Sequence, residues 1–314
     1  MIMILLALFA WRSYLGSYLD ETQAASIPKI QPKSLRFDLY DTERVTKQDS
    51  SNMSKCVMPA PESSKANTSL RTVYVITPTF RRHSQRPDIT RMAQTLISAR
   101  GVHWIVIEDS KNKSQYVTSL LQRMPFPYTH LQVPTNDSNK HTGLGGIDQR
   151  NAALRWLLSN NITQGVIYFA DDDNAYDRRL FDEFRTTEKV GMTAVGHFST
   201  AFSTPVVKNG KVVAFLDPYL SRKWPIDMAV FAVSVPFWRS RGAPLMRART
   251  GGLMESHFLS SLNIGFDDIE PKGKNCTEVL AWHVKTVAMT DRYKKFNFTK
   301  YRGTNVDSLL LAYD

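Results

Sequence analysis

The sequence has little cysteine, no dense run of positive charge and no long apolar segment. Its 314 residues include two cysteines, Cys56 and Cys276, and no Cys-x-x-Cys pair, which excludes a zinc ribbon and a thioredoxin-like redox motif. The two could pair with each other, or Cys56 could link two copies of the chain into a homodimer. The net charge of +11 comes from scattered Lys and Arg, so an anionic small substrate fits it at least as well as nucleic acid does.

One short apolar segment stands at the N-terminus. Residues 1–10 carry no polar side chain, but Arg12 interrupts the segment before the ~20 residues that a membrane-spanning helix needs. We expect residues 1–19 to form a short membrane anchor, and a signal peptide is the competing interpretation. Seven Asn-x-Ser/Thr sequons mildly favour the lumen of the secretory pathway.

The remaining chain divides by composition and by pattern. Residues 20–70 are rich in Ser, Lys, Gln, Thr and Pro without a sustained period, which is typical of a stem or linker. We expect the folded domain to span residues 71–314. Within it, residues 71–175 and 176–314 follow different patterns, so two halves are expected to share a cleft.

Strand-like and helix-like segments alternate in the first half. The expected strands cover residues 73–77, 102–107, 129–133 and 165–170, and the expected helices cover residues 88–99, 114–122 and 147–158. This alternation predicts an α/β fold with a largely parallel sheet. In the second half, Asn209-Gly210 predicts a hairpin over residues 206–213, and further strands are expected at 228–235 and 279–282. The second half is therefore expected to be mixed in strand direction.

Three consecutive aspartates, Asp171 to Asp173, follow directly on the fourth expected strand, and Asp109 follows the second. The carboxyl ends of parallel strands meet at one edge, where open α/β sheets bind ligands. Adjacent carboxylates repel one another unless a cation binds, and hard divalent ions such as Mn²⁺ or Mg²⁺ take oxygen ligands and bridge to a diphosphate. The alternative is a helix N-cap by Asp173 and Asn174, but a cap needs only one aspartate.

Several sequence blocks occur in a specific order. They are Ile-Thr-Pro-Thr-Phe at 76–80, Trp-Ile-Val-Ile-Glu-Asp at 104–109, Gly-Ile-Asp-Gln-Arg-Asn-Ala-Ala-Leu at 146–154, Tyr-Phe-Ala-Asp-Asp-Asp-Asn-Ala-Tyr at 168–176, Pro-Ile-Asp-Met-Ala at 225–229, Gly-Gly-Leu-Met-Glu-Ser at 251–256 and Asn-Cys-Thr-Glu-Val-Leu-Ala-Trp-His at 275–283. Over residues 71–286 the chain thereby resembles the inverting β-1,3-glucuronyltransferases, which build the proteoglycan linker and related glycans. A lone Asp-x-Asp carries little information, whereas these blocks together are specific.

The resemblance implies both a fold and an activity. The implied fold is GT-A-like, with a Rossmann-like half that binds the nucleotide sugar over residues 71–175 and a mixed acceptor half over residues 176–314. The implied reaction moves glucuronate from UDP-glucuronate to the 3-hydroxyl of a terminal galactose on a glycan, with Mn²⁺ as cofactor. The implied setting is the Golgi membrane, with a single-pass type II anchor and a luminal catalytic domain.

The resemblance also assigns roles to single residues. Glu255 matches the catalytic base, and Asp173 matches the metal ligand. Contacts with the nucleotide or the donor sugar are implied for Phe80, Asp109, Arg150, Asp171, Asp172 and His283. Acceptor contacts are implied for Arg222 and Asp227. Phe80 stands where the family has a tyrosine that stacks on uracil, so the aromatic plane is kept and the hydroxyl is lost.

Each of these residues also has an ordinary structural explanation. Glu255 could be a first-turn acid that complements a helix dipole. Arg150 could be a solvated charge in the middle of a helix, and His283 could be a structural residue after a strand. Asp227 could pair with Arg222. The complete set of matching blocks outweighs these explanations.

Three other functions compete with the leading one. The same mechanism could use another UDP-sugar, although Arg150, Arg247 or Arg249 could provide a cationic pocket for the glucuronate carboxylate. The chain could be a non-catalytic nucleotide or sugar binder, or a two-metal nuclease or polymerase, which would need basic stripes that the sequence lacks. Residues 199–204 lack an acidic residue that linker-forming members use near the acceptor, so the acceptor stays open.

Overall fold

The computed structural model describes residues 70–140, 145–197, 202–217, 222–247 and 254–286. The expected anchor over residues 1–19, the stem up to residue 69 and all residues after 286 lie outside these ranges. Within them, no helix combines the length and the apolar character needed to span a bilayer. The boundaries of anchor, stem and domain halves therefore stay predictions.

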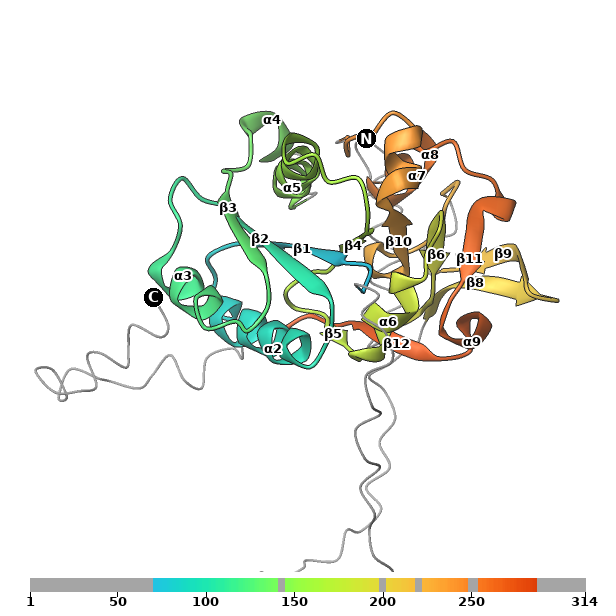
Figure 1. Cartoon of the computed structure of the whole chain (residues 1–314), viewed down its shortest axis with the longest axis horizontal. Helices are drawn as coiled ribbons and strands as arrows, with labels where there is room; N and C mark the ends of the chain where they lie inside the picture. The colour runs from blue at the N-terminus through green and yellow to red at the C-terminus, as the bar shows by residue number, and fades with distance from the viewer. Residues whose placement is uncertain (1–69, 141–144, 198–201, 218–221, 248–253, 287–314) are drawn as a thin grey trace, which may run out of the picture. The chain divides into compact units, whose positions relative to one another are not determined.

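A seven-stranded sheet with the order β11-β6-β10-β4-β1-β2-β3 forms the centre of the fold (Figure 1). The strands are β1 (Val73–Thr79), β2 (Val102–Glu108), β3 (Tyr128–Gln132), β4 (Val166–Phe169), β6 (Val190–Met192), β10 (Phe231–Ser234) and β11 (Ile269–Pro271). Strands β1 to β4 are parallel to one another. The expected α/β fold with a largely parallel first half is confirmed.

Helices cover both faces of these parallel strands. Helices α2 (Gln85–Ile97) and α3 (Gln115–Leu121) lie on one side, and α5 (Ile147–Ser159) lies on the other (Figure 1). Every residue of β4 is buried. Strands that are covered on both faces appear in a sequence as continuous apolar runs, which is why their positions could be predicted.

The second half of the chain extends the same sheet. Residues 228–235 were expected to form one strand, but they form a 3₁₀ turn, η1 (Met228–Val230), followed by β10. The turn forms because Asp227 caps it: its Oδ1 accepts a hydrogen bond from the N–H of Ala229 at 2.9 Å. Strand β10 then runs antiparallel to both β4 and β6.

A five-stranded sheet of mixed direction lies beside the first, with the order β5-β12-β7-β8-β9. Its strands are β5 (Ala175–Tyr176), β7 (Ala194–His197), β8 (Phe202–Lys208), β9 (Lys211–Leu216) and β12 (Val279–His283). Strand β12 is antiparallel to β5 and parallel to β7, with a register shift between Val279 and Ala281. Because β5 follows directly on the three aspartates, β12 brings His283 close to them.

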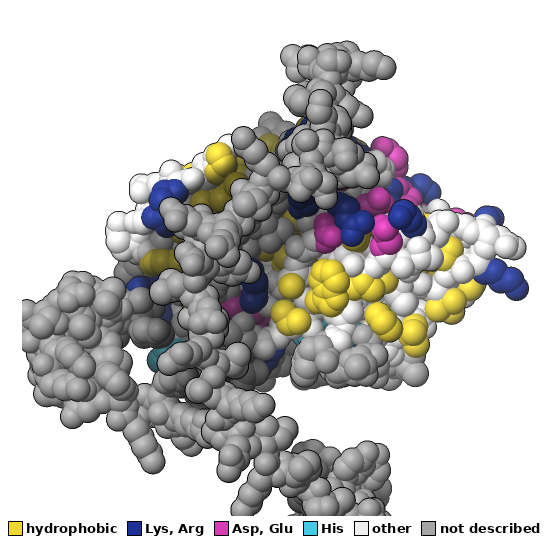
Figure 2. All heavy atoms as spheres, turned by 90° about the horizontal axis from the view of Figure 1, so that it is seen from below, with side chains coloured by type: hydrophobic (Ala, Val, Ile, Leu, Met, Phe, Trp, Pro, Cys, Tyr) yellow, Lys and Arg dark blue, Asp and Glu magenta, His cyan; other side chains and the backbone are white. Residues whose placement is uncertain are grey.

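The hairpin of β8 and β9 confirms the predicted Asn-Gly turn. Asn209 and Gly210 both have positive φ, as a two-residue turn of this kind requires. Phe202 on β8 and Leu216 on β9 are exposed apolar residues of this hairpin. Figure 2, a view from below, shows hydrophobic side chains gathered next to a mixed group of acidic and basic ones.

The remaining elements are short. They are α4 (Asp137–Lys140), α6 (Arg179–Arg185), α7 (Val235–Ser240), α8 (Met254–Ser261), α9 (Gly273–Cys276) and η2 (Phe266–Asp268). Helix α8 carries Glu255 in its first turn and packs on the central sheet through Phe258. The Phe258 ring meets Phe169 of β4 at 5.5 Å and Phe231 of β10 at 6.2 Å between centroids.

This aromatic cluster predicts the cost of a cavity. Phe169 is fully buried, so Phe169→Ala should lower the free energy of unfolding by about 3–5 kcal/mol, because the lost contacts leave a void under α8. Chemical denaturation would measure the change. Phe266→Ala is the matched control, since Phe266 is 44% exposed and its loss should cost far less. Equal losses for the two variants would contradict this account of the core.

Candidate active site

A cavity of about 510 Å³ opens at the carboxyl ends of β1, β2 and β4. This volume lies within the usual range for ligand pockets of ~300–1,000 Å³. The cavity is lined by Pro78, Thr79, Phe80, Arg82, Asp109, Gly145, Gly146, Gln149, Arg150, Asp171, Asp172, Asp173, Lys285 and Thr286. The structure thus brings together six residues that the sequence assigned to the donor or the metal. We call this space the donor cavity.

Each of the first two aspartates has its own guanidinium. Asp171 pairs with Arg150 of α5, whose side chain is 4% exposed and also donates to the carbonyl of Gly145 at 3.0 Å. Asp172 accepts two hydrogen bonds from Arg82, at 2.8 and 2.9 Å, and a third from the Thr79 hydroxyl at 2.6 Å. These two carboxylates are therefore held in place by the protein itself.

The third aspartate differs from its neighbours. Among the residues that the structure describes, no cationic side chain lies within ion-pair distance of the Asp173 carboxylate. Burial, followed by the charges of Asp171 and Asp172, raises the pKa of Asp173 to about 6. The donor cavity thus contains one carboxylate that forms no ion pair with a described cationic side chain.

Asp173 could supply only one of the ligands that surround a divalent cation. The described residues contain no group of three His, Cys, Asp or Glu side chains that could enclose a metal. Mg²⁺-type sites commonly use one or two carboxylates and complete their shell with substrate phosphates and water. Asp173 has an oxygen-ligand carboxylate that no described cationic side chain pairs with, so the donor set fits a cation that binds together with a diphosphate.

The outer wall of the donor cavity carries Phe80 and Asp109. The Phe80 ring is 53% exposed, and the Arg82 guanidinium carbon lies 4.8 Å from its centroid. Asp109 accepts hydrogen bonds from the backbone N–H and the hydroxyl of Thr135, at 2.7 and 2.5 Å. An exposed aromatic plane and a fixed carboxylate can stack on a planar base and accept its N–H.

A second acidic and basic group lies where β12 meets η1. His283 Nδ1 is 2.8 Å from Asp227 Oδ2, and the His283 ring stacks on His197 with 5.2 Å between centroids. The Asp227 carboxylate beside the ring raises the pKa of His283 to about 9, although burial opposes this. At neutral pH His283 is therefore an imidazolium that interacts electrostatically with Asp171 and Asp173.

Glu255 stands near this group at the start of α8. Burial raises the pKa of Glu255 to about 7, the charge of Asp227 adds to the rise, and Arg222 and Arg150 oppose it. Arg222 Nη1 lies 3.5 Å from the Glu255 carboxylate. Arg222 thus pairs with Glu255, and Asp227 pairs with His283. A carboxyl group with a pKa near 7 is suited to general base catalysis.

Sequence reasoning missed several residues that line the donor cavity. Arg82, Lys285 and Thr286 are the main ones, and Lys285 adds a positive charge two positions after His283. The closeness of Lys285 to His283 in the sequence could have suggested it, but no sequence feature distinguishes Arg82 from its basic neighbours. Arg247 lies elsewhere: it lines a different cavity of about 1010 Å³. Arg249 and residues 198–201 lie outside the described residues.

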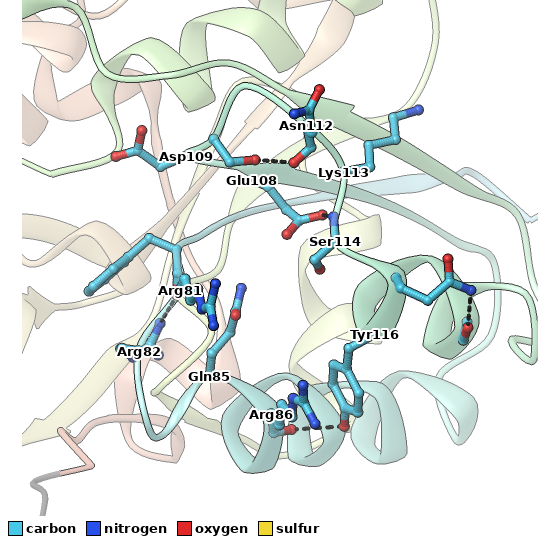
Figure 3. Close-up of a pocket in the computed structure, with 14 residues that line it drawn as sticks. Arg81, Arg82, Gln85, Arg86, Glu108, Asp109, Asn112, Lys113, Ser114 and Tyr116 are labelled. Carbon is cyan, nitrogen blue, oxygen red and sulfur yellow. Dashed lines mark hydrogen bonds between the residues drawn. The ribbon is translucent and has the colours of Figure 1, made fainter. Parts of the chain in front are cut away.

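A further cavity of about 710 Å³ adjoins the donor cavity and shares Phe80, Arg82 and Asp109 with it. Figure 3 shows Arg82 and Gln85 on the α2 side of this space, with Glu108 across from them. Glu108 is buried and accepts hydrogen bonds from His130 Nε2 at 2.7 Å and the Ser114 N–H at 2.8 Å. These bonds fix the end of β2 just before Asp109.

Comparison with known proteins agrees with this arrangement. Residues 92–287 match the model of glycosyltransferase family 43. The chain is 42% identical over 221 residues to galactosylgalactosylxylosylprotein 3-beta-glucuronosyltransferase S of Drosophila melanogaster, covering 69% of this chain and 54% of that protein. It is 42% identical over 226 residues to the enzyme of that series numbered 2 from Rattus norvegicus, covering 69% of each. The chain thus spans about half the length of the first relative and two thirds of the second.

One solved structure shows a distant likeness. A crystal structure of S. aureus TarS matches with a TM-score of 0.45 and 13% identity, over 68% of this chain and 36% of that one. So distant a likeness has no bearing on ligand or activity. The resemblance expected from the sequence blocks is confirmed by the family match and by the relatives.

The pairing of His283 with Asp227 predicts a titration. His283 should titrate near pH 9 in an NMR experiment, and Asp227→Asn should move its pKa back toward ~6.5 because the negative partner is gone. A raised pKa stabilises the fold while the imidazole is protonated. The ion pair's stabilisation is therefore complete below ~6.5, as long as Asp227 is ionised, and is lost as pH rises through about 9. A His283 pKa near 6.5 in the unaltered protein would contradict the pairing.

Proposed function

Since the chain belongs to glycosyltransferase family 43, we propose that it is an inverting β-1,3-glucuronosyltransferase that moves glucuronate from UDP-glucuronate to the 3-hydroxyl of a terminal galactose. One observation carries the proposal. The pKa of Glu255 responds both to Asp227, which pairs with His283, and to Arg150, which pairs with Asp171. A base of pKa about 7 thus lies within electrostatic reach of the groups that line or adjoin the donor cavity.

The base acts on the acceptor. The Glu255 carboxylate takes the proton of the galactose 3-hydroxyl as that oxygen attacks the anomeric carbon of the donor sugar. The bond from this carbon to the diphosphate breaks in the same step, and its electron pair leaves with UDP. Attack from the side opposite UDP inverts the configuration, so one base suffices. General base help of this kind is usually worth ~10²–10⁴ in rate.

Positive side chains act on the leaving group. Arg150 and Lys285 line the donor cavity, and His283 is an imidazolium at neutral pH. Fixed cations at the place where charge develops stabilise the transition state without reorganising. When bound at Asp173, a divalent ion such as Mn²⁺ would supply further charge neutralisation for the diphosphate.

The nucleotide is held by the outer wall. Phe80 is placed to stack on the uracil, and Asp109 to accept its N–H. Arg222 is assigned to the acceptor side because it holds the Glu255 carboxylate at 3.5 Å. The names of the relatives support a galactosyl-galactosyl-xylosyl acceptor in the proteoglycan linker, and a donor other than UDP-glucuronate is the second candidate.

We also propose a cellular setting. The apolar segment over residues 1–19 supports a single-pass type II anchor in the Golgi membrane, with the catalytic domain in the lumen. Cys56 in the stem supports a covalent homodimer, because Cys276 is partly buried within the fold. Selective permeabilisation of cells, with antibody access to the C-terminal part, would test the orientation. Non-reducing electrophoresis of Cys56→Ser would test the link.

A donor and acceptor panel tests the activity. The purified protein with Mn²⁺ should release UDP from UDP-glucuronate when a galactose-ended acceptor is present, and the product should carry a β-1,3 linkage. UDP-galactose and UDP-N-acetylglucosamine are the matched donors and should turn over far more slowly. Preference for one of these donors would move the assignment to the second candidate, and binding of UDP without any turnover would indicate a non-catalytic binder.

Glu255→Gln should separate binding from catalysis. The variant loses the carboxylate that takes the proton, so kcat should fall at least ~10²-fold while the dissociation constant for UDP stays within about threefold. In the unaltered protein the rate should rise as pH increases through about 7, because only the ionised carboxylate is a base. The rise should be absent from the residual rate of the variant. An unchanged kcat would remove Glu255 as the base.

Asp173→Asn tests the cation site. The substitution keeps the size of the side chain and removes its charge, so Mn²⁺ should no longer strengthen UDP binding in calorimetry. Binding of UDP without metal should change little, or improve, because a repelling charge is gone. Asp177→Asn is a control, since Asp177 pairs with Arg179 outside the donor cavity. If Mn²⁺ strengthens UDP binding to Asp173→Asn as it does to the unaltered protein, the ligand lies elsewhere.

A further inference from the structure

One guanidinium contacts two side chains that line the donor cavity and the buried Asp88 next to it. The Arg82 side chain is 18% exposed and follows Phe80 in the loop before α2. It donates to both oxygens of Asp172 at 2.8 and 2.9 Å, to Asp88 at 2.8 Å and to the Ser84 hydroxyl at 3.0 Å. Its face lies 4.8 Å from the centroid of the Phe80 ring.

The contacts continue beyond Arg82 itself. Asp88 in the first turn of α2 is 1% exposed, and it also accepts a hydrogen bond from the Thr286 hydroxyl at 2.6 Å. Thr286 and its neighbour Lys285 line the donor cavity. Arg82 therefore contacts the Phe80 ring and Asp172 directly, and it reaches the segment that follows β12 through Asp88.

The distribution of charge follows from this geometry. Asp171 has Arg150 and Asp172 has Arg82, while no cationic side chain among the described residues pairs with Asp173. The two Asp172 oxygens together accept three hydrogen bonds, two from Arg82 and one from Thr79, so most of their ~four lone-pair sites are occupied. The pairing thus decides which of three adjacent aspartates can bind a cation.

We propose that Arg82 is a positioning residue of the donor cavity. It keeps Asp172 from binding a metal, so that Asp173 is the single carboxylate for a cation, and it supports the Phe80 ring on which the nucleobase stacks. The proposal rests on the proposed function, because it assumes a nucleotide diphosphate and a divalent ion as ligands. None of the sequence blocks that resemble the family assigns a role to this position.

The proposed role requires the planar geometry of a guanidinium group. A guanidinium presents several N–H groups in fixed directions and can serve two carboxylates and an aromatic face at once. A lysine ammonium in its place would keep the charge and lose this geometry. Arg82→Lys is therefore the informative substitution, because a purely electrostatic role would survive it.

The experiment compares binding with turnover. For Arg82→Lys, the dissociation constant for UDP and the KM for the donor should both rise ~10-fold or more, the size expected from losing charged hydrogen bonds, while kcat at saturation stays within about threefold. For Arg82→Gln, calorimetry with Mn²⁺ in the presence of UDP should detect a second, weaker cation, because Asp172 is released. Arg179→Lys is the matched control: its guanidinium pairs with Asp177 at 2.8 Å outside both cavities, and UDP binding should not change.

A double variant guards against misfolding. If Arg82→Gln does not fold, Arg82→Gln with Asp172→Asn removes the carboxylate left without a partner, and this variant should bind one Mn²⁺. Unaltered UDP affinity in Arg82→Lys, or a single Mn²⁺ in a folded Arg82→Gln, would overturn the role of Arg82. Failure of the unaltered protein to bind UDP would instead overturn the proposed function.

Discussion

Repulsion among three carboxylates at the end of a buried strand is the constraint on which the donor cavity depends. Every residue of β4 is buried, so polar side chains can follow only after the strand has ended. Asp171 to Asp173 come at this point, next to one another. Two of them are compensated by arginines from different elements, α5 and the loop before α2. The cavity is thus assembled from distant segments that charge pairing brings together, and Asp173 is left without an ion-pair partner among the described cationic side chains.

The same electrostatics extend to the acceptor side. Asp227 caps η1, pairs with His283 and helps to raise the pKa of Glu255, so one carboxylate contributes to local folding and to the ionisation of two other side chains. Burial is the larger cause of the raised pKa of Glu255, which depends on the packing of α8 over the aromatic cluster of Phe169 and Phe258. Core packing and the ionisation of Glu255 are therefore linked through a single helix.

The sequence predicted the parallel strands and singled out six residues that line the donor cavity, because continuous apolar runs and ordered motif blocks are local signals. It did not predict η1 and the antiparallel course of β10, since these depend on a cap and on pairing with β4 and β6 far along the chain. Arg82 was missed for the same reason: its partner Asp172 is distant in sequence, and an arginine beside another arginine has no distinguishing pattern. The pairing of Arg222 with Glu255 likewise needed coordinates.

The irregular pairing of β12 has a consequence of its own. Side chains alternate between the two faces of a strand, so a displacement by one residue exchanges the faces of all that follow. The register shift between Val279 and Ala281 comes just before Trp282, which is exposed, and His283, which meets Asp227. The extra residue, Leu280, sets the face that each following side chain occupies, so its removal would give Trp282 the face that His283 now occupies and turn His283 away from Asp227.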